Sequence, residues 1–232
     1  MKTTAATDST FVHLAQELGA RFAERAAKHD LEGSFVSDNY AELKRNRLMS
    51  AGVPKELGGG GATHAELCAM LRELGRHCGS TALALSMHTH LVATQVWRYR
   101  HGQPAEALLR KIADGELVLV STGAGDWLDS TGDAQRVEGG FRVSAVKRFA
   151  SACPVGDLLV TSAPYRDPEH GEQVIHFGLP LKAAGVSLHD DWNTVGMRGT
   201  GSHSVELKDA FVAQETVSLT RFAFALRIPF CL

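Results

Sequence analysis

The chain has 232 residues, with 24 basic and 26 acidic side chains, 44% hydrophobic residues and 7% aromatic residues. This length suits one large domain or two smaller ones and excludes a disulfide-stapled miniprotein. A formal net charge of −2 argues against a dedicated nucleic-acid-binding protein, which usually carries a basic excess. The sequence has neither an apolar run long enough to span a membrane nor an apolar signal segment, so we expect a cytoplasmic protein.

The first part of the chain has the apolar spacing of helices. Near its start, apolar residues recur three and four positions apart: Phe11, Leu14, Ala15, Leu18, Phe22 and Ala26. This spacing predicts a helix with one buried stripe. Four further helices are predicted to begin near residues 37, 63, 80 and 104. Thr63 and Glu66 have the spacing of a capping box, which marks the start of the third helix. We therefore predict an all-helical domain over residues 1–115.

After Gly115 the apolar period changes to two, which is typical of strands. Strands are predicted over six segments: 117–120, 135–138, 141–145, 158–161, 174–177 and 205–212. Gly139-Gly140 is a hairpin signal between the second and third of them. Because the helices precede the strands rather than alternate with them, the pattern predicts an α+β chain and disfavours a doubly wound nucleotide fold. The β domain is expected over 116–217, followed by an irregular apolar tail over 218–232.

Several motifs in the sequence do not support a site. Gly58-Gly59-Gly60-Gly61 is preceded by no strand and followed by no Gly-Lys-Ser/Thr ending, so a connector is the better interpretation. His88 and His90 are two positions apart on a predicted helix, so their rings diverge, and we predict no metal site. The four cysteines, at 68, 78, 153 and 231, lack CxxC spacing and are expected to be reduced.

Two segments of the β half carry the groups that a flavin pocket needs. The segment Ser121-Thr122-Gly123-Ala124-Gly125-Asp126-Trp127 follows a buried strand, and its hydroxyls and backbone N–H groups suit a polar ring edge or a phosphate. Phe149 precedes Ser151 by two positions, so a ring beside a flat cofactor and a hydroxyl at its edge would both be supplied. Taken alone, each segment is better explained as an ordinary turn or a core aromatic.

The order of several motifs is more specific than any one of them. From Gly52 to about Val217 the chain resembles the acyl-CoA dehydrogenase family. Five segments carry the resemblance, in the family's order: Val53–Gly61, Leu71–His90, Lys111–Glu116, Lys147–Ser151 and Gly196–Ser202. In the fourth, Phe149 and Ser151 occupy the places of Trp and Thr in the family's Trp-Ile-Thr motif.

The resemblance implies an N-terminal helical domain, an antiparallel β-barrel-like middle domain and a C-terminal helical bundle, with FAD between the last two. Ser121, Thr122 and Gly125 would line the flavin pocket, Phe149 would pack beside the isoalloxazine, and Ser151 would bond near its reactive nitrogen. The implied function is a FAD-dependent oxidoreductase that dehydrogenates an acyl-CoA between its α and β carbons. Family members generally form homo-oligomers.

Two departures from the family pattern keep alternatives open. The family's Thr/Ser-Glu-Pro segment is absent, and Ser121-Thr122 runs directly into Gly123. This leaves room for a flavin-dependent monooxygenase of the same fold, acting on another small molecule. The family's bundle, with its catalytic carboxylate, has no counterpart in this sequence, so we assign no catalytic residue and expect a truncated chain. A non-catalytic remnant or assembly module is the third hypothesis.

Overall fold

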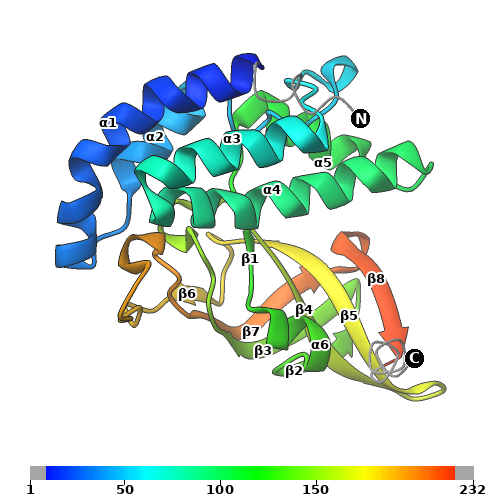
Figure 1. Ribbon diagram of the computed structural model, residues 1–232. Helices are drawn as coiled ribbons and strands as arrows, with labels where there is room; N and C mark the ends of the chain where they lie inside the picture. The colour runs from blue at the N-terminus through cyan, green and yellow to red at the C-terminus, as the bar shows by residue number, and fades with distance from the viewer. Residues whose placement is uncertain (1–8, 223–232) are drawn as a thin grey trace, which may run out of the picture. The chain divides into compact units, whose positions relative to one another are not determined.

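The computed structural model describes residues 9–222, which form two compact units (Figure 1). The first unit extends to Leu119 and also includes Trp192–Gly201, whereas the second contains Val120–Asp191 and the chain from Ser202 onward. The division differs from the predicted domains 1–115 and 116–217, because the chain returns to the first unit for ten residues. Within that unit Arg198 Nε donates to Asp30 O at 2.7 Å, a contact across 168 positions that no local pattern indicates.

The first unit is helical, as predicted. Its elements are α1 (Thr10–Glu32), α2 (Ser37–Arg45), η1 (Lys55–Leu57), α3 (His64–His77), α4 (Gly79–Arg100), α5 (Glu106–Gly115) and η3 (Arg198–Thr200). Helix α3 packs between α1 and α4. The predicted capping box is confirmed, since Thr63 N donates to Glu66 Oε2 at 2.8 Å and Glu66 N donates to Thr63 Oγ1 at 3.3 Å. Among the described helices none has both the length and the apolar character needed to cross a bilayer.

His88 has a structural role in the first unit. Its side chain is buried on α4, where the backbone N–H of Leu119 donates to Nδ1 at 3.0 Å. Nδ1 is therefore the acceptor, and Nε2 carries the proton that it shares with Met49 O at 2.9 Å. The ring thus joins three separate stretches of chain and is not positioned as a metal ligand.

The second unit is built on one sheet. Its strands are β1 (Leu119–Ser121), β2 (Asp133–Val137), β3 (Gly140–Lys147), β4 (Leu158–Asp167), β5 (Gly171–Pro180), β6 (Val186–Leu188), β7 (Val205–Ala213) and β8 (Val217–Phe222). The short helices are α6 (Ala124–Asp129), η2 (Cys153–Val155) and η4 (Gln214–Thr216). The strand order is β6-β7-β3-β2-β4-β5-β8, and β1 pairs with β4 (Figure 1).

The α+β class and the hairpin at Gly139-Gly140 are confirmed, with Val137 paired to Gly140 across the turn. The sheet is mainly antiparallel, although β2 and β4 pair in parallel at Ala134 and Tyr165. No pairing joins β6 to β8 among the described strands, so these strands form an open sheet.

The prediction of an irregular tail from residue 218 is wrong for residues 218–222, which belong to β8. Arg221 pairs with Val174 and Thr220 pairs with Ile175, so β5 supplies the hydrogen bonds that make this segment a strand. Local alternation there is only two apolar residues long, at Val217 and Leu219, which is too short to predict a strand alone. The rest of the predicted tail, 223–232, lies outside the described residues.

The pairing of β3 with β7 leaves no room for a side chain at Gly140. A Cβ built there would lie 2.1 Å from Val212 O, which is backbone and cannot move aside as a side chain can. We expect Gly140→Ala to lower the free energy of unfolding by about 1–3 kcal/mol, measured by urea denaturation. Gly178→Ala is the control, because its nearest neighbour is the flexible side chain of Leu158 at 3.3 Å. Equal stability of the two variants would contradict this prediction.

Candidate functional site

Ser121 and Thr122 lie buried at the end of β1, directly before α6. The segment after them was expected to be a turn, but Ala124–Asp129 form a helix of six residues. Gly125 is exposed on that helix, and no atom lies within 4 Å of a Cβ built on it. The predicted flavin-binding segment therefore consists of a strand end, a two-residue connection and one open helical turn.

The hydroxyl of Thr122 is engaged inside the protein. It donates to Asp126 Oδ2 at 2.8 Å, and Thr161 Oγ1 on β4 donates to the same carboxylate oxygen at 3.1 Å. Asp126 thereby fixes α6 to the strand end. The Thr122 hydroxyl proton is thereby used, so Thr122 can offer a ligand its main chain and the lone pairs of its hydroxyl oxygen.

A buried ion pair that the sequence reasoning did not predict lies under α6. Lys147, at the end of β3, is fully buried, and its Nζ donates to Asp126 Oδ1 at 2.8 Å and to Thr131 O at 2.7 Å. Burial alone would raise the pKa of Asp126, but the ammonium of Lys147 and hydrogen bonds from Lys147 and Thr131 outweigh burial and lower it. Burial lowers the pKa of Lys147, and Asp126 offsets part of that change. Asp126 is thus an anchored anion and a poor proton acceptor.

Phe149 lies beside the connection between β1 and α6. The N–H of Gly123 donates to Arg148 O at 3.1 Å, and a Cβ on Gly123 would lie 2.9 Å from Phe149 Cδ2. The ring is 58% exposed, and its residue has a φ of 60°, in the left-handed region. An exposed large aromatic and a left-handed bulky residue are both unfavourable, and such positions concentrate at binding sites.

Ser151 contacts a different part of the second unit. Its side chain is buried, and its Oγ lies 2.8 Å from Ser202 Oγ. Next to it, Ala150 N donates to His203 O at 3.1 Å. The structure therefore brings Gly123 next to Phe149, while Ser151 is held against the segment that leads into β7.

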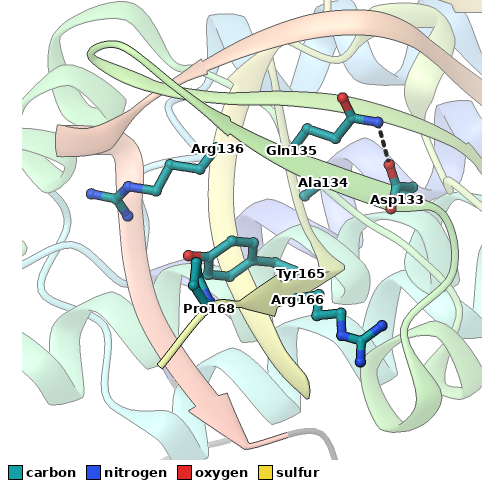
Figure 2. Close-up of a pocket in the computed structure, with 7 residues that line it drawn as sticks. All are labelled: Asp133, Ala134, Gln135, Arg136, Tyr165, Arg166 and Pro168. Carbon is teal, nitrogen blue, oxygen red and sulfur yellow. Dashed lines mark hydrogen bonds between the residues drawn. The ribbon is translucent and has the colours of Figure 1, made fainter. Parts of the chain in front are cut away.

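A separate pocket of about 330 Å³ opens at β2 and the end of β4 (Figure 2). Its lining residues are Asp133, Ala134, Gln135, Arg136, Tyr165, Arg166 and Pro168. The side chains of Arg136 and Arg166 point away from one another, so they do not converge on a single anion. None of the five predicted flavin residues lines this pocket.

Metal and thiol chemistry find no support in residues 9–222. No group of three or more His, Cys, Asp or Glu side chains there is placed to hold a metal ion. Cys68 is exposed, whereas Cys78 and Cys153 are buried, and none of the three forms a disulfide within the described residues. Burial raises the pKa of Cys153 to about 12, so this thiol is not a nucleophile at neutral pH. Cys231 lies outside the described residues.

Several known proteins are similar to this chain in both sequence and fold. Residues 8–116 match the family model "Acyl-CoA dehydrogenase, N-terminal domain". L-evernosamine nitrososynthase of Micromonospora is 29% identical over 84% of this chain and 48% of its own length. "Probable FMNH2-dependent monooxygenase SfnC" of Pseudomonas putida is 28% identical over 82% and 47%. Mitochondrial isovaleryl-CoA dehydrogenase of Solanum tuberosum is 28% identical over 88% and 51%.

A solved structure is similar over nearly the whole chain. It is KijD3 in complex with FMN and dTDP-3-amino-2,3,6-trideoxy-4-keto-3-methyl-D-glucose, with a TM-score of 0.84, 26% identity, and coverage of 96% of this chain and 57% of that one. The chain spans about half the length of the curated relatives it matches. Residues 8–116 thus match an acyl-CoA dehydrogenase N-terminal domain, and the chain has the acyl-CoA dehydrogenase-like fold.

Proposed function

We propose that this chain is the flavin-binding part of a reduced-flavin-dependent monooxygenase that acts on a small organic molecule. The observation that carries the proposal is the exposed ring of Phe149 beside Gly123, at the end of β1. The backbone of Phe149 is held in the left-handed conformation. A flat aromatic cofactor would cover that ring and remove its unfavourable exposure. The main chain of Ser121 and Thr122, the open turn at Gly125, and Ser151 would hold the rest of the cofactor.

The relatives favour FMN over the FAD that the family resemblance first implied. One relative is named for FMNH2, and one similar structure contains FMN. When bound, reduced flavin supplies the electrons with which dioxygen is activated to transfer one oxygen atom to a substrate. In this proposal, the residues of this chain bind and orient the flavin ring, and Phe149 shields one part of it from water.

Acyl-CoA dehydrogenation is the second candidate, favoured by the likeness to isovaleryl-CoA dehydrogenase. That reaction needs a carboxylate to remove the α proton of the substrate. Asp126 is the carboxylate nearest to the predicted flavin segment, and its oxygens are held by Lys147 and by three threonines. With its pKa lowered, it does not serve as that base. In the acyl-CoA dehydrogenase family this carboxylate comes from the C-terminal bundle, so Asp126 does not distinguish the two reactions, and the monooxygenase is favoured by the relatives.

Flavin binding tests this proposal directly. We expect the purified chain to quench FMN fluorescence on titration and to bind FMN at least about tenfold more tightly than FAD, a difference of about 1.4 kcal/mol. Phe149→Ala is expected to weaken FMN binding by about tenfold or more, as loss of a stacked aromatic does. Phe211→Ala is the matched control, because Phe211 is a similarly exposed ring in the same unit, on β7.

Turnover then distinguishes the two candidate reactions. Oxidation that depends on supplied reduced FMN and dioxygen supports the monooxygenase, whereas anaerobic bleaching of bound flavin by an acyl-CoA supports the dehydrogenase. A chain that binds neither FMN nor FAD would contradict both and leave a non-catalytic module. Equal FMN affinity of the Phe149 and Phe211 variants would show that Phe149 does not pack on the flavin.

A further inference from the structure

Arg221 on β8 holds the C-terminal end of α6. Its Nη2 donates to Trp127 O at 2.8 Å and to Leu128 O at 3.3 Å. Carbonyls in the last turn of a helix have no hydrogen-bond donor within the helix, so a guanidinium that donates to them caps the helix. Arg221 therefore ties a six-residue helix, too short to be stable alone, to the edge of the sheet.

His176 on β5 orients that arginine. Arg221 Nε donates to His176 Nε2 at 3.0 Å, so Nε2 is unprotonated and the neutral ring carries its proton on Nδ1. Nδ1 is buried and has no hydrogen-bond partner among the described residues. The ring of Trp127, on α6, lies against the imidazole at a centroid distance of 5.1 Å. His176 thus contacts both the helix and the arginine that caps it.

The opposite end of the same helix carries the predicted flavin segment. Gly123 is the residue before α6, and Gly125 lies in its first turn. Asp126 ties that end to β3 and β4 through Lys147 and Thr161. Because α6 has only six residues, release of its C-terminal end would loosen the connection that contains Gly123 and Gly125.

We propose that Arg221 and His176 form a latch, here called the α6 latch, that positions the flavin-binding segment and is released when His176 gains a proton. Arg221 is a positioning residue in this proposal, since it acts through α6. The link to flavin rests on the proposed function above, whereas the link to α6 does not.

The charges around His176 explain why protonation would release the latch. Arg221 on β8 and Lys147 on β3 disfavour an imidazolium, and Asp126 on α6 favours one. Burial first, and then Arg221, lower the pKa of His176 to about 4. The ring is therefore neutral at pH 7 and accepts from Arg221. Once protonated it has no lone pair at Nε2 and faces a guanidinium of like charge.

Hydrogen exchange of the flavin-free chain tests the latch through the amides of Ser130 and Thr131. These amides donate to Asp126 O at 2.7 Å and to Asp126 Oδ1 at 3.0 Å, so their protection reports how firmly α6 is held. Arg221→Gln is expected to lower their protection factors by about tenfold. Arg166→Gln is the matched control, because Arg166 is an exposed arginine whose ion pair is with Glu172.

His176→Gln separates the latch from a merely structural role. The glutamine oxygen can accept from Arg221 Nε in place of Nε2 but does not titrate, so protection at pH 7 should remain that of the wild type. The pH range from 5.5 to 3.5 extends from about 1.5 units above to about 0.5 units below the pKa of His176. Over this range the protection factors of the wild type should fall by about tenfold, and those of His176→Gln should not. Identical pH profiles, or unchanged protection in Arg221→Gln, would overturn the latch.

FMN titration tests whether the latch also affects flavin binding. If the latch positions the flavin segment, Arg221→Gln weakens FMN binding by about the same factor as it lowers the protection of the α6 amides. The single variant His176→Gln should keep the wild-type affinity for FMN at pH 7. Loss of protection with unchanged FMN affinity would overturn the positioning role. If the wild-type chain binds no flavin at all, the proposed function fails, and the exchange data still decide whether the latch exists.

Discussion

Lys147→Met is expected to destabilise the second unit by about 3–5 kcal/mol, because it leaves the carboxylate of Asp126 buried without its cation. Lys147 is 0% exposed, so water cannot replace the ammonium. The hydrogen bonds from Thr122, Thr131 and Thr161 remain and compensate only in part. Since α6 depends on Asp126, the same change should also abolish flavin binding.

Urea denaturation measures this effect in the second unit by itself when Trp127 is the reporter. The sequence has three tryptophans, and Trp97 and Trp192 belong to the first unit, so their replacement by Phe leaves a single probe in the second. Lys208→Met, which removes an exposed lysine on β7, should change stability by less than about 0.5 kcal/mol.

A double-mutant cycle with Asp126→Asn completes the test. The double variant should be less destabilised than the sum of the single variants, because neither residue then leaves its partner unpaired.

The pH dependence of the Asp126 contribution to stability has a definite sign. The folded-state pKa of Asp126 lies below the unfolded value, so its contribution is present above about pH 3.9 and is lost as pH falls below it. A cost below about 1 kcal/mol for Lys147→Met would show that the pair is not buried as described.

The elements that the sequence predicted are those with strong local signals. Helix α1 has a clear apolar stripe, and Thr63 with Glu66 marks the start of α3 by side-chain chemistry alone. The hairpin between β2 and β3 follows from the turn preference of Gly139 and Gly140. Such signals depend on residues that are close in the chain, so they can be recognised without knowing the fold.

The elements that the sequence did not predict depend on distant partners. Helix α6 exists because Asp126 meets Lys147 and Arg221 meets the carbonyls of Trp127 and Leu128, contacts that span between 21 and 94 positions. The candidate site was predicted by residue type and motif order. Its buried ion pair and its latch were not, because a lysine or an arginine in sequence gives no sign of what it will contact.

Glu116→Ala is the change in the first unit with the largest expected cost. Glu116 Oε2 accepts from the backbone N–H groups of Met49 at 3.0 Å and Ser50 at 3.3 Å, and Oε1 accepts from the Ser50 hydroxyl. Glu116 is buried, so alanine would leave the two backbone donors without a partner, whereas the Ser50 hydroxyl could still donate to Arg47 O at 3.3 Å. Each unsatisfied buried donor costs about 1–3 kcal/mol, and we expect a total loss of about 3 kcal/mol or more.

The backbone of Glu116 allows the lost hydrogen bonds to be separated from strain. Its φ of 47° is left-handed, a conformation that costs about 1–2 kcal/mol for residues with a Cβ and little for glycine. Glu116→Gly should therefore be about 1 kcal/mol more stable than Glu116→Ala, although both lack the carboxylate. Glu106→Ala, on the exposed face of α5, the helix that ends just before Glu116, should cost less than about 0.5 kcal/mol. Urea denaturation of a Trp127→Phe background, in which Trp97 and Trp192 report on the first unit, measures all three. A glycine variant no more stable than the alanine variant would mean that the left-handed turn is not retained, and the hydrogen bonds from Met49 and Ser50 could not then form as described.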